Sequence, residues 1–198
     1  MSTTTELHNR PVRIVGMGAL SAIGMNVNEN FQSLKTRQHG IAYPEILQTR
    51  YARQFPCGEI RYTNKALAEK TNLPDDLPRT IYLSTLAARE ALQGLPTVQE
   101  IETAGFKTGF ISGNTIGGMD LTEKFYDAFR HDHSMGKLSQ IRFHECGSIT
   151  TYTASVLGFK GYHTTLNTAC SSSANALMLT ARLIQHSVLN VVLTSGAD

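Results

Sequence analysis

The chain has 198 residues, 41% of them hydrophobic and 17% charged, which indicates a globular protein able to bury a core. Its formal net charge of +2 includes no long basic block, so we expect no nucleic-acid partner, although surface Lys and Arg could contact an acidic protein. No apolar run approaches the ~20 residues that span a bilayer, and residues 1–7 lack the features of a secretory signal. The three cysteines are scattered and odd in number, which favours free thiols and a cytoplasmic location.

The first predicted elements alternate with irregular chain. Residues 12–17 are rich in β-branched side chains and contain a glycine near their end, which predicts a short buried strand. Asn26 and Glu29 resemble a capping box, so a helix is expected to begin there and to end at Gly40. Residues 41–78 contain four prolines and are expected to form a surface excursion that carries at most a short hairpin or helix.

The rest of the chain alternates helices and strands. Helices are expected over residues 79–92, 121–128, 149–157 and 174–185, and strands over 106–112, 162–168 and 190–195. The order predicts an α/β fold with a mainly parallel sheet that helices cover on both faces. Because the last strand ends at the end of the chain, we expect an incomplete folding unit.

Cys170 is the most informative residue of this pattern. An extended run that ends at Thr168 leads into Cys170, and small residues and a helical pattern follow directly. The backbone N–H groups and the dipole at a helix start favour a thiolate, the nucleophile of acyl transfer. A buried structural cysteine is the alternative, which the strand-to-helix position and the serines at 171–173 disfavour. Cys57 and Cys146 are expected to be bystanders, with Cys146 at a helix start the more reactive of the two.

Two glycine-rich segments resemble nucleotide-binding motifs only superficially. Residues 16–21 follow a strand, but Ser21 replaces the third glycine of the dinucleotide fingerprint and no acidic residue ends a second strand at the required spacing. Residues 113–118 are no phosphate-binding loop, because Met119 stands where a lysine is needed. This second segment is either a close-packed loop or the lining of a substrate tunnel, with Ile116 as the projecting side chain.

The histidines give weak signals. His131 and His133 lie one residue apart without a third matched ligand, so a solvated turn is expected and neither a metal site nor a cofactor is predicted. The other histidines are isolated, and none is placed by a motif as a base for Cys170. An unrelated cysteine hydrolase would need such a base, which disfavours that function.

Taken together, these motifs resemble the N-terminal half of the β-ketoacyl-[acyl carrier protein] synthases, the elongating condensing enzymes of fatty acid and polyketide synthesis. The run Asn167-Thr168-Ala169-Cys170-Ser171-Ser172 is close to their nucleophile signature, Thr-Ala-Cys-Ser-Ser. Further segments are similar in order: residues 12–18 with Gly24, the glycine-rich loop 113–118, the Gly-x-x-Gly of 158–161, and the strand with a Gly-Ala-acid end at 191–198. The resemblance covers nearly the whole chain.

The resemblance implies a thiolase-like fold, in which two α/β halves pack into five αβαβα layers. Residues 1–198 would then form the N-terminal domain, without its last strand and without the whole C-terminal half. Cys170 would accept an acyl group from acyl carrier protein as a thioester, with its own backbone N–H in the oxyanion hole. The carbanion of decarboxylated malonyl-carrier protein would attack that thioester. Thr115, Ile116 and Gly117 would shape the acyl pocket, and Thr115 replaces a glycine that is usual in the family.

The resemblance also implies what this chain lacks. In the family, two histidines that stabilise the oxyanions of the reaction, and a lysine, lie in the second half. We therefore expect this chain alone not to catalyse condensation and to be a fragment of a longer enzyme, with a separate chain that carries the second half as the less favoured alternative. The expected partners are a second condensing subunit, in a homodimer or heterodimer, or the missing C-terminal half. Two alternatives remain open: a non-catalytic chain-length-setting subunit, which typically lacks the cysteine, and a thiolase or coenzyme A-dependent priming synthase. The acyl substrate, whether fatty acid, polyketide or polyene, is not predicted.

Overall fold

A three-stranded parallel sheet forms the centre of the computed structural model, which describes residues 11–197. Its strands are β3 (Thr108–Gly113), β4 (Tyr162–Leu166) and β5 (Val191–Gly196), in the order β4-β3-β5. The register brings Leu166, Gly113 and Gly196 into one row at the carboxyl ends of the strands. The expectations for residues 1–7 and for the acidic residue Asp198 lie outside the described residues.

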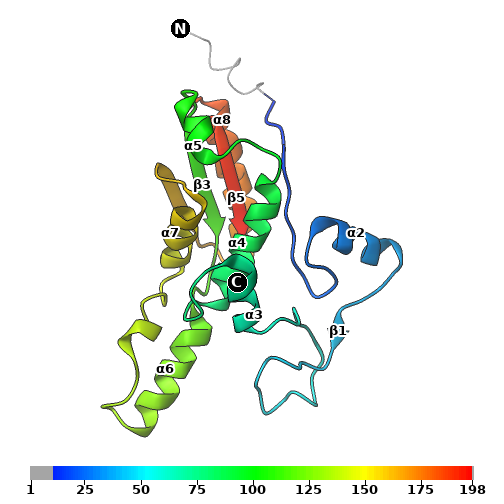
Figure 1. Cartoon of the computed structure of the whole chain (residues 1–198), viewed down its shortest axis with the longest axis vertical. Coiled ribbons are helices and arrows are strands. Elements are labelled where there is room, and N and C mark those ends of the chain that lie inside the picture. The colour runs from blue at the N-terminus through cyan, green and yellow to red at the C-terminus, as the bar shows by residue number, and fades with distance from the viewer. Residues whose placement is uncertain (1–10, 198) are drawn as a thin grey trace.

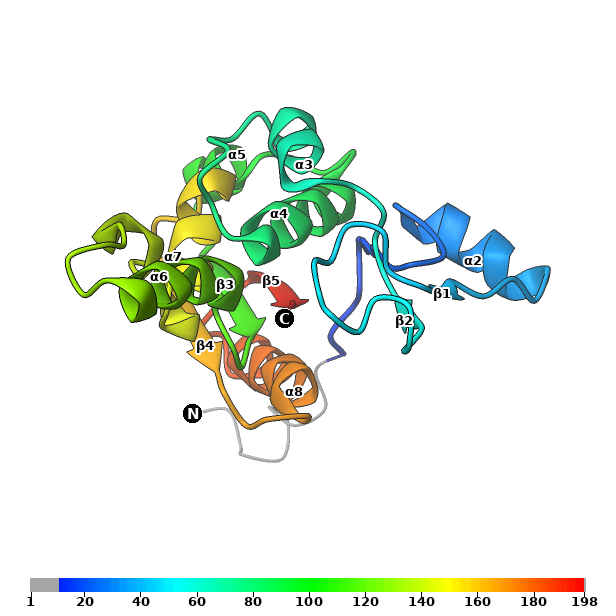
Figure 2. The ribbon, with the colours of Figure 1, turned by 90° about the horizontal axis from the view of Figure 1, so that it is seen from below.

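Helices cover both faces of this sheet, as the sequence predicts. Helix α8 (Ser172–Gln185) contacts all three strands on one face. Helices α4 (Arg79–Leu92) and α7 (Cys146–Leu157) pack against each other on the opposite face, and Figure 2 shows the sheet between these two layers. The α/β expectation is therefore confirmed.

Two apolar clusters form the core. The larger one joins α4, α7 and helix α3 (Asn64–Thr71) and contains Leu67, Ala68, Leu77, Ile81, Tyr82, Phe143 and Ile149. The smaller one joins β3 and α7 to α5 (Val98–Thr103), through Val98, Phe110, Ala154 and Phe159. Pairs of hydroxyl groups also connect the sheet to the helices on both of its faces. Thr165 donates to Thr150 at 2.5 Å, and the hydroxyls of Thr180 and Thr194 lie 2.6 Å apart.

The strand expected over residues 12–17 is wrong. Residues 11–20 have no regular secondary structure, and Figure 1 shows them as a long unpaired trace beside the sheet. Ile14 is 77% exposed and Val15 is 67% exposed, whereas a buried strand would hide both. Sequence pattern alone could not reveal this, since a strand also needs a hydrogen-bonding partner and no described segment supplies one here.

Two glycines nevertheless allow this segment to lie directly against the backbone of α4. A Cβ atom at Gly16 would lie 1.9 Å from the carbonyl oxygen of Ala91, and one at Gly18 would lie 1.9 Å from that of Ala87. Only residues without a side chain allow so close an approach to a helix backbone.

Helix α2 (Val27–Lys35) begins where it was predicted. The side chain of Asn26 accepts the backbone N–H of Glu29 at 2.8 Å, which caps the first turn. The helix ends at Lys35, before the predicted Gly40, because Arg37 adopts a left-handed conformation with φ of 56° and turns the chain.

Three further elements are helices α5 and α6 (Met119–His131) and a 3-10 turn. Helix α5, which the sequence analysis did not predict, has a capping box in which Thr97 and Glu100 bond each other's backbone N–H groups. Helix α6 and the 3-10 turn Leu138–Gln140 project away from the sheet (Figure 1).

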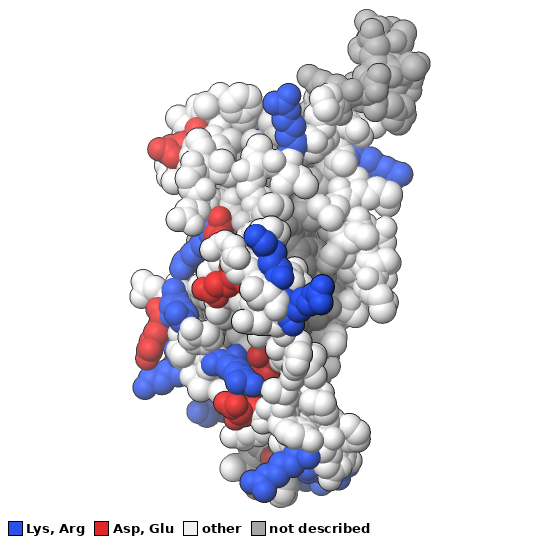
Figure 3. Space-filling view, turned by 90° about the vertical axis from the view of Figure 1, so that its right-hand side faces the viewer, with Lys and Arg blue, Asp and Glu red and all other residues white. Residues whose placement is uncertain are grey.

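None of the helices within residues 11–197 is long and apolar enough to span a membrane. Figure 3 shows Lys and Arg side chains interspersed with Asp and Glu over one side of the molecule.

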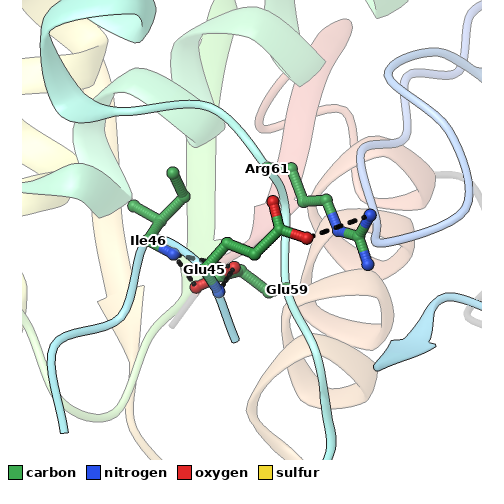
Figure 4. Close-up of polar contacts among 4 residues, drawn as sticks. All are labelled: Glu45, Ile46, Glu59 and Arg61. Atoms are coloured by element: carbon green, nitrogen blue, oxygen red, sulfur yellow. Dashed lines mark hydrogen bonds and ion pairs between the residues drawn. The ribbon is translucent and has the colours of Figure 1, made fainter. Parts of the chain in front are cut away.

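The excursion over residues 41–78 carries both a short antiparallel strand pair and a helix, where the sequence predicted at most one of the two. Strands β1 (Ile41–Ala42) and β2 (Cys57–Gly58) pair antiparallel, and α3 follows them. The carboxylate of Glu59 accepts the backbone N–H groups of Glu45 and Ile46 at 2.7 and 3.0 Å (Figure 4), and that of Leu47 at 2.6 Å. Burial raises the pKa of Glu59, but these bonds and the charge of Arg79 lower it by more, so this pKa lies below its ordinary value.

The first turn of α8 lies directly on the carboxyl ends of β3 and β5. A Cβ atom at Gly113 would lie 2.5 Å from the backbone nitrogen of Ser173, and one at Gly196 would lie 2.1 Å from the Ser173 hydroxyl oxygen. The helix can start this close to the sheet only because both strands end in glycine.

Glu59→Gln tests whether the bonds from the Glu59 carboxylate to residues 45–47 stabilise the excursion. Because the folded-state pKa of Glu59 is lowered, its contribution to the free energy of unfolding is fully present above the ordinary value of 4.5 and is lost as the pH falls through the folded-state pKa. Urea unfolding across a pH series should therefore show a stability difference between wild type and variant that shrinks in acid. Glu45→Gln, at an exposed ion pair with Arg61, is the control. A difference for Glu59→Gln that does not change with pH would contradict this.

Gly113→Ala tests the contact between α8 and the sheet. The added methyl group meets backbone atoms of α8 that cannot rotate away, so we expect the free energy of unfolding to fall by about 1–3 kcal/mol. Gly147→Ala is the matched control, because nothing lies within 4 Å of its added Cβ. In helix α7 that substitution should be neutral or stabilising by up to about 1 kcal/mol. Equal effects of the two substitutions in denaturant titrations would refute the close contact.

Candidate functional site

The turn between β4 and α8 carries Cys170 at the carboxyl edge of the sheet. Strand β4 ends at Leu166, α8 begins at Ser172, and the Cys170 side chain is exposed. Ala169, directly before it, has a left-handed conformation with φ of 53°. This conformation costs a residue with a Cβ atom roughly 1–2 kcal/mol, so the surrounding contacts must hold the turn in place.

Ser172 holds this turn from inside the structure. Its buried hydroxyl donates to the carbonyl oxygen of Ala169 at 2.7 Å and accepts the backbone N–H of Thr168 at 2.9 Å. Ser171 also donates to the carbonyl oxygen of Thr168, at 2.8 Å, and Asn175 donates to the Thr168 hydroxyl at 2.7 Å. Hydrogen bonds on both sides of Cys170 thus fix the backbone from which its thiol projects.

Two N–H groups at the start of α8 are already used within the turn. The Ser171 N–H donates to the carbonyl of Thr168 at 3.3 Å, and the Ser172 N–H donates to that of Ala169 at 3.0 Å. The N–H groups of Ser171 and Ser172 are therefore not free to face the Cys170 sulfur, contrary to the expectation for the start of this helix.

The glycine-rich loop lies beside this turn. Asn167 donates through Nδ2 to the carbonyl oxygen of Thr115 at 3.4 Å, and the hydroxyls of Thr115 and Ser172 lie 3.5 Å apart. Ile116 is 47% exposed, and Gly117 has a φ of 73° that favours glycine. The structure thus brings the loop that carries the predicted pocket residues next to the turn that carries the predicted nucleophile.

Cys146 lies nearer to this site than the sequence suggested. It starts α7 and is half-buried, and its sulfur accepts a hydrogen bond from Asn167 Nδ2 at 3.6 Å. Cys57 lies in β2 of the excursion. Asn114, Asn167 and Ser172 were not predicted from the sequence as residues that hold the site. For the two asparagines a signal exists, because each lies close to the carboxyl end of a predicted strand, where an asparagine side chain often bonds the backbone.

No metal centre is evident: residues 11–197 contain no group of three or more His, Cys, Asp or Glu side chains that could hold an ion. The histidine pair has local partners. His131 Nδ1 lies 2.8 Å from the carbonyl oxygen of Asp127, and the ring of His133 stacks on Phe129 with centroids 4.7 Å apart. The site as a whole offers an exposed thiol in a hydrogen-bonded turn beside a glycine-rich loop, which suits covalent attachment of a carbonyl compound.

Comparisons with known proteins identify the family of the chain. The model of the family "Beta-ketoacyl synthase, N-terminal domain" matches residues 9–198. The chain is 27% identical over 206 residues to 3-oxoacyl-[acyl-carrier-protein] synthase 2 of Vibrio harveyi, which covers 97% of this chain and 46% of that protein. The corresponding synthase 2 of Coxiella burnetii is 25% identical over 200 residues, with the same coverage of 97% and 46%. The chain thus spans about half the length of the curated relatives it matches.

Solved structures share the fold. The ishigamide ketosynthase/chain length factor superimposes with a TM-score of 0.79 at 22% identity, over 93% of this chain and 46% of that one. A type II PKS ketosynthase in complex with its acyl-carrier protein gives a TM-score of 0.63 at 15% identity, over 92% and 49%. These likenesses confirm the predicted thiolase-like fold, and the match of the family model over nearly the whole sequence shows that the chain belongs to the beta-ketoacyl synthase family.

Proposed function

We propose that this chain is the acyl-accepting half of a β-ketoacyl-[acyl carrier protein] synthase and that Cys170 is its nucleophile. The observation that carries the proposal is the position of Cys170: exposed, in a rigid turn at the carboxyl edge of three parallel strands, within the run Thr-Ala-Cys-Ser-Ser. Ligands of open α/β sheets bind at this edge.

The proposed reaction has two stages. The Cys170 thiolate attacks the carbonyl carbon of an acyl thioester on acyl carrier protein, the carrier leaves as its thiolate, and the acyl group stays on Cys170. Malonyl-carrier protein then loses carbon dioxide, and its carbanion attacks the Cys170 thioester. A carbon–carbon bond forms, the Cys170 thiolate is released, and the product is a 3-ketoacyl chain two carbons longer. The Cys170 N–H would stabilise the oxyanion of each tetrahedral intermediate.

The glycine-rich loop would shape the acyl pocket. Thr115, Ile116 and Gly117 lie on the loop that contacts the nucleophile turn through Asn167 and Ser172. Ile116 offers an apolar side chain with room to contact an acyl chain, since it is only half-covered by the described residues. The larger Thr115, where the family usually has glycine, would narrow or redirect this channel.

The proposed enzyme needs further polypeptide. The histidines that stabilise the oxyanions of decarboxylation lie in the second half of the family's proteins. This chain alone would therefore not catalyse the condensation reaction. Leu177 and Met178 on α8 are 57% and 47% exposed, which supports a second half or a partner subunit covering that helix. Acyl carrier protein would be the other partner, and the interspersed Lys and Arg side chains of Figure 3 offer cations to an acidic protein surface. A cytoplasmic location stays a prediction.

A chain-length-setting subunit is the second candidate function. The likeness to a structure described as a ketosynthase/chain length factor is compatible with it, because both kinds of subunit share this fold. The exposed Cys170 disfavours it, since such a subunit does not need a nucleophile.

Cys170→Ala tests the proposed function. The purified protein is first examined by native and denaturing mass spectrometry to count its polypeptides, and is then given acyl- and malonyl-carrier protein. With a second polypeptide present, 3-ketoacyl product should form, and Cys170→Ala should abolish it, whereas Cys57→Ala should not. A single 21.7 kDa species should give no product.

Three results would contradict this account. Full activity of Cys170→Ala would exclude the nucleophile, and elongation by the single chain at an ordinary rate would refute the need for the second half. A strong preference for coenzyme A over carrier-protein donors would favour a priming synthase or thiolase instead.

A further inference from the structure

Asn114 is a fully buried polar residue at the carboxyl end of β3, and the reaction proposed above does not use it. Its exposed fraction is 0%, yet each end of its amide has a partner. Nδ2 donates to the carbonyl oxygen of Ala197 at 2.8 Å, and Oδ1 accepts the backbone N–H of Gly117 at 3.0 Å. Its own backbone N–H donates to the carbonyl oxygen of Leu166 at 3.2 Å.

These three bonds join the ends of the sheet to the loop. Leu166 ends β4, Ala197 follows β5, and Asn114 itself follows β3, so one residue connects all three carboxyl ends. The third bond, to Gly117, reaches the far side of Ile116. A buried amide with both ends bonded is held in one orientation, because rotation would leave donor and acceptor unsatisfied.

The loop is thereby fixed on both sides of Ile116. Asn114 holds Gly117, and Asn167 holds the carbonyl oxygen of Thr115 at 3.4 Å. A Cβ atom at Gly117 would lie 2.7 Å from the carbonyl oxygen of His144, so the loop also lies tightly against the segment before α7. The direction in which Ile116 projects beside the Cys170 turn depends on these contacts.

We propose that Asn114 is a positioning residue that sets the acyl-chain selectivity of Cys170 by holding the Ile116 loop against the ends of the strands. Asn114 does not contact the acyl chain, because it is fully buried. It acts through Gly117 and Ile116. The proposal rests on the proposed function, in which Cys170 accepts an acyl group and the loop lines its pocket.

Chain selectivity is a sensitive readout of loop position. Each methylene group buried in an apolar pocket changes a rate or affinity roughly fourfold. A loop that no longer holds Ile116 in one place should bury fewer of these groups, and discrimination between chain lengths should weaken. A general loss of stability would lower all rates together and would leave their ratio unchanged.

Asn190, at the amino-terminal ends of the same strands, provides a matched control. Asn190 Oδ1 accepts the backbone N–H of Lys107 at 2.9 Å, which joins the amino ends of β5 and β3. Asn114 and Ala197 join the carboxyl ends in the same way. Asn190→Ala therefore removes a comparable connection far along the strands from Cys170.

The experiment measures acylation of Cys170 in the purified enzyme by butanoyl, octanoyl and dodecanoyl thioesters of N-acetylcysteamine, with the modified peptide identified by mass spectrometry. Alkylation of Cys170 by iodoacetamide reports its reactivity without a chain. Asn114→Ala should change the ratio of dodecanoyl to butanoyl rates by about tenfold and leave the iodoacetamide rate within about twofold, while Asn190→Ala keeps the wild-type ratio. Asn114→Ser, which lacks both Nδ2 and Oδ1 and therefore loses the amide bonds to Ala197 and Gly117 while leaving a smaller cavity than alanine, decides the question if Asn114→Ala does not fold.

Two different results would overturn the proposal. A wild-type ratio in folded Asn114→Ala or Asn114→Ser would show that Asn114 has no role in selectivity, while the proposed function stands. No acylation of wild-type Cys170 by any donor would overturn the proposed function itself, and this inference with it.

Discussion

The close contact between the first turn of α8 and the carboxyl ends of β3 and β5 is the constraint on which the rest of the structure depends. Glycine at positions 113 and 196 lets the helix backbone reach the sheet. Since α8 must begin there, the chain leaving β4 has only five residues in which to turn, and Ala169 takes up a left-handed conformation. Cys170 is exposed at the edge of the sheet as a result, and the glycine-rich loop is brought beside it.

Much of the fold was predictable because local patterns decide it. Helix α4 spans the predicted residues 79–92, and the three paired strands lie within a few residues of their predicted bounds. The prediction failed at residues 12–17, where the β-branched pattern is present but no described strand pairs with the segment. Helix α5 was missed because it is short, although its Thr97–Glu100 capping box is visible in the sequence. The pattern of side chains shows that a segment suits a β-strand, but it does not show whether a neighbouring strand is present to pair with it.

The position of Cys170 could be predicted from the sequence, but the residues that hold its turn could not. A cysteine between an extended run and a helical pattern is a local signal, so the position of Cys170 at a strand-to-helix turn follows from the sequence. The residues that hold it are different. The contacts of Asn114 and Asn167 join segments far apart in the chain, and a single sequence does not show such pairs. Ser172 is one of three consecutive serines, and only the structure shows that its hydroxyl is the buried one.

The central claim is that this turn exists to present a nucleophile to an acyl donor. The most direct measurement is the intact mass of the protein after a single exposure to acyl-carrier protein, followed by peptide mapping. The account predicts a mass increase of one acyl group, located on Cys170, which hydroxylamine removes because the bond is a thioester. An acyl group on Cys146 or Cys57, or an unchanged mass under conditions in which iodoacetamide modifies Cys170, would contradict it.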